Sequence, residues 1–487
     1  MGAAGVWMLV AVAVVLVATG LPAWIVLIGV ALLFALAGIA ADVIAVPLLS
    51  AMPGRLIGLL DNDLLQALPL YVLMGALLNR LPLAEMLFRV GSKLLARTGA
   101  GGPLAGLGLG VLLAPMNGSV GASVAMLSRI VQPRLDASGM TTERSAALVC
   151  TASTLGVVVP PSLVLILLGD AMMRAHTEAL NLTRQSVRII NTQDVFVGAL
   201  VPAALLLLLG GVLTWWLSRG TPPLSAAAAS PRPKPSEWLT AVVTTLFIVA
   251  LLASVTAGYL YAVEAAAAGG VALFAFGVGT RALTRSVLRD VLRDTMAITG
   301  ALFALLVSAT VFTLVLRAYG TDRWMALALS ELGGGEHAAL TLVLLVLALC
   351  ALVLDAFEMI FVVIPVVIPP LLTLVPNTTW VAVLVLLILQ ASFLLPPFGY
   401  SVLMVRNSLK RPLCMSALTR ALLPYLVAQL CVLAVVLAQP QLVWQRNPTE
   451  LVPAGDMKSE SEGMEMLQRQ LDQQGSERPA PPEPTHN

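Results

Sequence analysis

The sequence predicts an all-α polytopic membrane protein made of two inverted repeats, each with a re-entrant hairpin and a broken transmembrane helix. Hydrophobic residues make up 59% of the 487-residue chain and charged residues only 11%. Apolar runs long enough to cross ~30 Å of hydrocarbon recur from end to end. A polar interruption followed by a Pro-Pro pair occurs twice, at Pro160-Pro161 and at Pro396-Pro397. The number of residues from the first polar break of each copy to its Pro-Pro pair is nearly the same, which predicts an internal repeat.

The first repeat is expected to occupy residues 1–218, and its early part is a series of apolar runs. Gly5–Ala18, Ala23–Ala40 and Asp63–Asn79 are predicted spans, with the shorter Pro47–Asp61 at the membrane interface. Leu83–Arg97 places apolar residues on one side of a helix and charged residues on the other. That spacing predicts an amphipathic helix along the membrane surface.

A hairpin is expected at 102–131, because its two apolar arms are each too short to span and flank the polar tip Asn117–Ser119. Basic residues lie at both outer ends, which indicates that the segment enters and leaves on one side. The span that follows, 145–168, is predicted to break at Gly156 and Pro160. Asp170–Asp194 is then expected to be a polar loop, and Val195–Leu217 a returning span.

The second repeat, 238–438, follows a Pro-, Ala- and Ser-rich cytoplasmic linker at 219–237. Trp238–Gly258 and Ala262–Val278 are its first predicted spans, and Arg281–Asp294 is expected to match the interfacial Pro47–Asp61. The second hairpin is predicted at 338–375 and the second broken helix at 378–405. Residues 439–487, rich in Glu, Gln and Pro, predict a disordered tail.

Lys and Arg residues fix the expected orientation. More than half of the chain's 28 basic residues fall in five segments that the positive-inside rule assigns to the cytoplasm. With that choice the first repeat begins outside and the second begins inside. The two hairpins therefore enter from opposite faces.

The interruptions are the predicted binding site. Free backbone groups inside a membrane need protein or a water-filled cavity to receive them, and paired broken helices in inverted repeats are typical of secondary transporters. Opened helix ends offer carbonyl oxygens to Na⁺ and N–H groups to a carboxylate. The predicted Na⁺ ligands are Asn117, Gly118, Ser123, Ser153, Thr154 and Gly156 in the first repeat and Leu354, Asp355, Gln390, Ser392 and Gly399 in the second. The predicted substrate contacts are Asn117, Ser119, Ser162 and Glu358.

Simpler explanations exist for these residues. Small residues such as Gly and Ser also serve close helix packing in membranes. Asp355 and Glu358 could lie in water at the outer surface, or could cap the short helix after the hairpin tip. An intramembrane carboxylate is nevertheless costly, which favours a functional role.

Other classes of function lack their motifs. The chain has no Gly-rich phosphate loop with its Lys-Ser/Thr, no HExxH and no GxSxG, so we expect neither an enzyme nor an organic cofactor. Basic residues are dispersed among loops, which argues against a nucleic-acid partner.

At its motifs the sequence resembles the large membrane subunit of TRAP (tripartite ATP-independent periplasmic) transporters. The branch it is most similar to is the mannitol/chloroaromatic-type large permeases. The matching stretches are Leu70–Gly75, Asn117–Val124, Thr154–Ser162, Leu165–Asp170, Leu354–Glu358 and Ser392–Gly399. Two positions depart from the branch pattern, because Asn117 stands in place of a Thr or small residue and Leu395 in place of a Thr.

The resemblance implies an elevator-type, Na⁺-driven importer of a small organic acid in the bacterial inner membrane, using two or more Na⁺ ions. It also implies two protein partners, a small four-span membrane subunit and a periplasmic solute-binding protein. Two alternatives remain open at this point: a stand-alone Na⁺/dicarboxylate symporter and an intramembrane enzyme. The identity of the substrate is not predicted, because specificity in this family resides largely in the binding protein.

Overall fold

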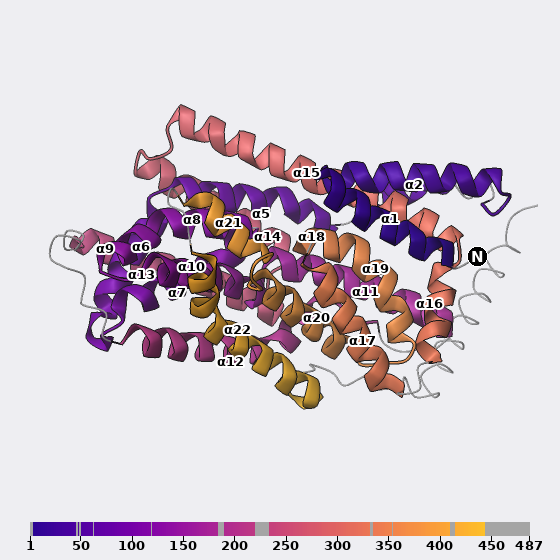
Figure 1. Cartoon of the computed structure of the whole chain (residues 1–487). Coiled ribbons are helices and arrows are strands. Elements are labelled where there is room, and N and C mark those ends of the chain that lie inside the picture. The colour runs from indigo at the N-terminus through magenta and orange to yellow at the C-terminus, as the bar shows by residue number, and fades with distance from the viewer. Residues whose placement is uncertain are drawn as a thin grey trace, which may run out of the picture.

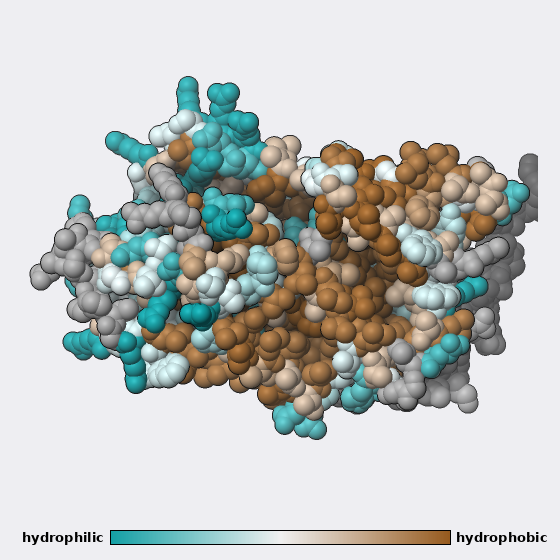
Figure 2. Space-filling view, viewed as in Figure 1, coloured by the Kyte–Doolittle hydropathy of each residue, from teal (hydrophilic) through white to brown (hydrophobic). Residues whose placement is uncertain are grey.

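The computed structural model describes residues 3–44, 47, 50–61, 63–117, 119–183, 189–219, 233–331, 335–352, 354–409 and 414–443. Every regular element among these residues is a helix. Figure 1 shows most of the helices running along the long axis of the molecule. In the described part, six helices are long and apolar enough to cross a membrane, or up to eight spans if each bent pair counts as one. Figure 2 shows an apolar belt between more hydrophilic ends, so the predicted all-α membrane class is confirmed.

The first half begins with helices close to the predicted ones. They are α1 (Ala3–Thr19), α2 (Ala23–Ala40), α4 (Met52–Leu60), α5 (Asp63–Arg80) and α6 (Leu83–Leu94). Helix α6 is amphipathic, as its spacing predicts. Its apolar side is buried through Leu83, Leu87 and Val90, against the helices that follow.

The first hairpin consists of α7 (Gly101–Leu113), η2 (Ala114–Asn117) and α8 (Val120–Ile130), and the short α9 (Gln132–Ala137) follows it. Glycines let α7 approach its neighbour closely. A Cβ atom at Gly110 would lie 2.5 Å from the Ala152 carbonyl oxygen, and one at Gly106 would lie 2.7 Å from Val131 Cγ1. The hairpin therefore packs tightly against the broken helix.

The broken helix consists of α10 (Thr142–Val158) and α11 (Leu163–Thr183), bent by 43° at the break, and α12 (Thr192–Ser218) follows. Gly156 lies inside α10, so the break begins only at Val159. The physical reason is that Pro160 and Pro161 have no N–H to donate, and a residue before a proline disfavours the helical conformation.

The expectation of a polar loop at Asp170–Asp194 is wrong, because α11 continues to Thr183. Polar residues in this stretch find partners without leaving the helix. The Asp170 carboxylate accepts a hydrogen bond from Arg174 Nε at 3.0 Å, one turn later. His176 is buried and hydrogen-bonds Thr378 of a distant helix.

The second half follows a similar order. Its elements are α13 (Pro235–Ala257), α14 (Ala262–Gly279), α15 (Arg285–Ala318), α16 (Thr321–Ser330), α17 (Gly335–Cys350), α18 (Ala356–Glu358), the π-helical η3 (Met359–Val363), α19 (Ile364–Leu372), α20 (Thr378–Phe393), α21 (Tyr400–Ser408), α22 (Met415–Ala438) and η4 (Pro440–Leu442). The separate interfacial element expected at Arg281–Asp294 is wrong, because α15 runs unbroken through this region. Between Arg285 and Thr299 the sequence has no Gly or Pro to end a helix.

Several contacts between a helix of the first half and a helix of the second have a counterpart in which the two halves are interchanged. Helix α14 packs on α5 while α15 packs on α2, and α21 contacts α8 while α19 contacts α11. Two similar halves related by a two-fold axis would give this exchange. Arg80 at the end of α5 binds Asp290 at 3.0 Å and Asp294 at 2.6 Å near the start of α15, so these two helices run antiparallel. The inverted placement of the repeats in a membrane stays a prediction.

Most of the predicted linker (220–232) and nearly all of the predicted tail (444–487) lie outside the described residues. Gly118 also lies outside them, and Asn117 is described only as the last residue of η2.

Candidate functional site

A small cavity lies where the first hairpin meets the first break. Its volume of about 10 Å³ is close to the space that one water molecule needs. Ser119, Ser123, Ser153 and Ser162 line it together with Pro115, Val120, Val157, Leu163 and Val164. The structure thus brings four predicted site residues together from the start of α8, from α10 and from the residue before α11.

The hydroxyl groups in this cavity are held by the backbone. Ser153 Oγ donates to the Cys150 carbonyl at 2.8 Å, and Ser162 Oγ donates to the Val157 carbonyl at 2.6 Å. Ser119 Oγ accepts from the Ala122 N–H at 3.1 Å and so caps α8. A hydroxyl has one proton and two lone pairs. A serine hydroxyl that donates its proton to a backbone carbonyl can offer only oxygen lone pairs to the cavity. Oxygen lone pairs are the ligands that a hard cation prefers.

Other predicted ligands of the first repeat lie beside this cavity and not in its wall. Thr154 is buried in α10, where its Oγ1 donates to the Thr151 carbonyl at 3.0 Å. Gly156 is also buried in α10. The contribution of Asn117 and Gly118 stays a prediction.

A larger cavity of about 330 Å³ lies between α5, α8 and α15. Ser119 lines both this cavity and the small one, and Phe357 brings the second hairpin tip to its wall. Arg80, Arg129 and Asp294 also line it. A volume of this size is at the lower end of the ~300–1,000 Å³ typical of small-molecule sites.

The two arginines of the larger cavity differ in their partners. Arg80 is held by Asp290 and Asp294. Arg129 donates to the Asn79 carbonyl oxygen, and among the described residues no carboxylate lies within 4 Å of its guanidinium. Its positive charge is therefore available to an anionic solute.

In the second repeat, Asp355 and Glu358 cap the helix after the hairpin tip. Asp355 Oδ1 accepts from the Glu358 N–H at 2.9 Å, and Glu358 Oε2 accepts from the Asp355 N–H at 3.1 Å. This reciprocal pair is a capping box. The structure therefore shows the capping role that the sequence left open for Asp355.

None of the second-repeat candidates, Asp355 and Glu358 included, lines either cavity. Gln390 is fully buried, and neither of its amide atoms has a hydrogen-bond partner within the described part of the chain. Ser392 Oγ donates to the Leu389 carbonyl at 2.7 Å. The backbone at Gly399 lies close to that of Phe393, since a Cβ at Gly399 would lie 2.5 Å from the Phe393 carbonyl oxygen. Leu354 is partly buried beside Asp355.

Sequence reasoning missed three residues near the site. One is Arg129, described above. Another is Tyr400, whose hydroxyl lies 2.9 Å from where a Cβ of Gly121 would be. The last is Ser401, whose Oγ donates to the Phe393 carbonyl at 2.6 Å, as Ser162 does to Val157 at the first break. A serine within four residues of each Pro-Pro pair was the available signal.

Comparison with known proteins identifies the family. The model of the DctM component of the tripartite ATP-independent periplasmic transporter matches residues 10–442. The chain belongs to this family. It is therefore a TRAP large permease, a multi-pass protein of the bacterial inner membrane, and the relatives it matches are permeases and not enzymes.

Individual relatives are distant but cover most of the TRAP large permease. The C4-dicarboxylate TRAP transporter large permease protein DctM of Pseudomonas aeruginosa is 25% identical over 77% of this chain and 84% of its own. The protein of the same name from Rhodobacter capsulatus is 22% identical over 78% and 85%. The crystal structure of the Alcanivorax borkumensis YdaH transporter matches with a TM-score of 0.60 at 19% identity, over 82% of this chain and 90% of that one. This last likeness concerns the fold alone.

Proposed function

We propose that this TRAP large permease is the transport subunit of a Na⁺-driven importer that moves a small organic acid by an elevator mechanism. One observation supports this most directly. An ion-sized cavity lined by serine oxygens shares Ser119 with a larger cavity that contains the unneutralised Arg129. A cation and an anionic solute would therefore bind on two sides of one residue.

The small cavity supports Na⁺ as the ion. Its polar lining is oxygen from four serines, the ligand type that hard cations prefer. No group of three or more His, Cys, Asp or Glu side chains gathers to hold a metal in the part of the chain that the structure covers. A further Na⁺ would bind in the second repeat, where the buried Gln390 amide offers an oxygen.

The larger cavity supports an organic acid as the solute. The guanidinium group keeps its charge at all physiological pH values and binds a carboxylate through two parallel hydrogen bonds. The Pseudomonas aeruginosa and Rhodobacter capsulatus relatives are each named a C4-dicarboxylate TRAP transporter large permease protein. C4-dicarboxylates are therefore the first class to test.

Two partner proteins complete the proposal, a small four-span membrane subunit and a periplasmic solute-binding protein. Helix α13 supports the first of these. It is long and apolar enough to span a membrane, and it exposes Leu239, Val242 and Leu246. Such a face needs lipid or another membrane protein against it.

The test is uptake of radiolabelled succinate into proteoliposomes that contain the permease, the small subunit and the binding protein. We expect uptake under an inward Na⁺ gradient and none when K⁺ replaces Na⁺. Equal uptake driven by a proton gradient alone would contradict the proposal. Equal uptake without the binding protein would support a stand-alone symporter instead.

The role of Arg129 is tested by Arg129→Gln, with the exposed Arg97→Gln as a control of equal charge. Loss of a hydrogen bond between charged groups costs ~1.5–3 kcal/mol, so we expect KM for the acid to rise at least ~10-fold in Arg129→Gln. Arg97 lines neither cavity, and its variant should match the wild type. An unchanged KM in both variants would remove Arg129 from the site.

A further inference from the structure

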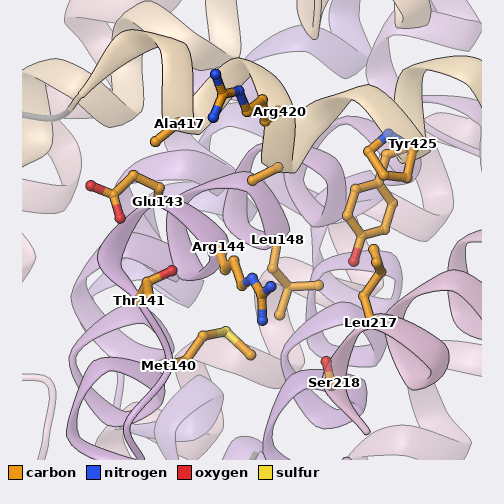
Figure 3. A pocket seen from close by; sticks show the side chains of 12 residues that line it. Met140, Thr141, Glu143, Arg144, Leu148, Leu217, Ser218, Ala417, Arg420 and Tyr425 are labelled. Carbon is orange, nitrogen blue, oxygen red and sulfur yellow. The ribbon is translucent and has the colours of Figure 1, made fainter.

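A cavity of about 350 Å³ lies apart from the proposed transport site, between the start of α10, the end of α12 and the start of α22 (Figure 3). None of its lining residues lines the two cavities described above. Its wall includes Arg144, Arg420, Ser218 and Tyr425. The proposed function of the permease makes no use of it.

The cavity carries two positive charges that the described residues do not neutralise. Within the described ranges, no carboxylate lies within 4 Å of the Arg144 or Arg420 guanidinium. Glu143 lines the same cavity, but Figure 3 shows its carboxylate and the guanidinium groups of Arg144 and Arg420 pointing in three different directions. The Tyr425 hydroxyl lies 3.1 Å from Thr214 Oγ1 and is thus already paired. An anion is the ligand that this lining favours.

The cavity lies at the ends of two candidate membrane spans, α12 and α22, and adjoins apolar surface. Arg420 begins a helical stripe of exposed residues on α22 that continues with Leu423, Val427 and Leu430. Helix α12, which contacts α22, exposes Leu208, Val212 and Trp216. In a bilayer such residues face acyl chains, and a tryptophan near the end of a span lies at headgroup level. The linker predicted to be cytoplasmic, 219–237, directly follows α12 at this end.

We propose that this cavity binds the headgroup of an anionic membrane phospholipid. The charges of Arg144 and Arg420 attract its phosphate to the cavity, and its acyl chains lie along the exposed stripes of α12 and α22. Arginine matches phosphate oxygens in geometry, and basic pockets between spans on the cytoplasmic side are suited to anionic headgroups. The adjoining apolar stripes favour a lipid over free phosphate, which has no use for them.

The test is native mass spectrometry of the permease extracted from vesicles of phosphatidylethanolamine and phosphatidylglycerol. The variant carries Arg144→Gln and Arg420→Gln. The control carries Arg97→Gln and Arg323→Gln, which remove the same charge from exposed positions outside the cavity. We expect wild type and control to retain phosphatidylglycerol, and the cavity variant to retain about fivefold less for each arginine removed.

Three results would overturn the proposal. Equal retention by wild type and cavity variant would show that the arginines hold no lipid. Equal retention of phosphatidylethanolamine and phosphatidylglycerol by the wild type would show no preference for an anionic headgroup. Stabilisation of the wild type against heat by millimolar inorganic phosphate, with no retained phosphatidylglycerol, would make this a site for free phosphate.

Discussion

Ser153 and Ser308 are buried serines that make the same hydrogen bond in different surroundings. Each hydroxyl donates to the carbonyl three residues earlier, at 2.8 Å in Ser153 and 2.7 Å in Ser308. Only Ser153 lines the ion-sized cavity. The pair therefore separates the effect of losing an ion ligand from the effect of losing a buried hydroxyl.

We predict that Ser153→Ala raises the Na⁺ concentration for half-maximal uptake several-fold, because the cavity loses one oxygen. Ser308→Ala should leave that concentration unchanged, since its hydroxyl only bonds within α15. Both variants lose a hydrogen bond worth ~1 kcal/mol, so their thermal stabilities should fall by similar amounts. Equal shifts in Na⁺ dependence for the two would place the ion elsewhere.

Two variants of Asp355 distinguish its role as a helix cap from a role in binding Na⁺. An Asn side chain still has a carbonyl oxygen that can accept from the Glu358 N–H, so Asp355→Asn should keep the cap and the thermal stability. Asp355→Ala loses the cap and ~1 kcal/mol. If the carboxylate also attracts Na⁺, Asp355→Asn should raise the Na⁺ concentration for half-maximal uptake. An unchanged value at a normal rate would leave Asp355 with the cap alone.

At the scale of elements, a re-entrant first hairpin implies that its two outer ends lie on the same side of the membrane. We expect single cysteines at Arg97, after α6, and at Ala137, at the end of α9, to react from the same face. Both positions are exposed. The native cysteines are replaced beforehand, because Cys414 and Cys431 are also exposed. Arg134 is a poor position for the label, since it pairs with Glu85 and lies over Phe88.

Membrane-impermeant maleimide added to sealed vesicles and then to opened vesicles gives the measurement. Labelling of the two positions from opposite faces would make α7 and α8 parts of one crossing. The first of the two re-entrant hairpins that the predicted inverted repeats require would then be absent.

The sequence was most informative where polar residues interrupt apolar runs. Asn117–Ser119 and the two Pro-Pro pairs stand out because a membrane leaves few reasons for such residues, and the ends of α8, α10 and α20 lie close to them. The four serines of the small cavity were all predicted site residues, Ser123 and Ser153 as Na⁺ ligands and Ser119 and Ser162 as substrate contacts. The structure gathers them at one cavity, and their roles stay predictions.

Long-range contacts explain what the sequence did not reveal. In the stretch that was expected to be a loop, His176 hydrogen-bonds Thr378, some 200 residues away in the sequence. Arg129 belongs to the site only because α5 and α15 close a cavity beside it. No spacing along the chain encodes such a meeting. The second-repeat ligands were chosen by analogy with the first repeat, and the structure does not gather them in the same way.

At the scale of the whole molecule, the two halves share their interior. Helix α5 packs on α14 and α2 packs on α15, so each half completes the surface of the other. Arg80 of the first half also binds Asp290 and Asp294 of the second. Separating the halves would therefore expose the apolar residues that make these contacts.

We therefore predict that a chain cut between Ser218 and Pro235 is functional only when both pieces are made together. Each piece expressed alone should be degraded or should fail to survive mild detergent, because the surfaces that face the other half would be exposed. Co-expressed pieces should co-purify through an affinity tag on one of them and restore uptake. Stable accumulation of one piece alone would show that the halves are independent domains.

The position of Ser119 between two cavities affects how ligands in them would influence each other. Its hydroxyl caps α8, and its side chain belongs to the walls of both cavities. A ligand that shifts this residue from one side changes the free energy of binding on the other, and thermodynamic linkage makes that change equal in both directions. If the ion raises solute affinity tenfold, the solute raises ion affinity tenfold, a coupling of ~1.4 kcal/mol. In the proposed transport cycle, one serine side chain would thus couple the binding of ion and solute.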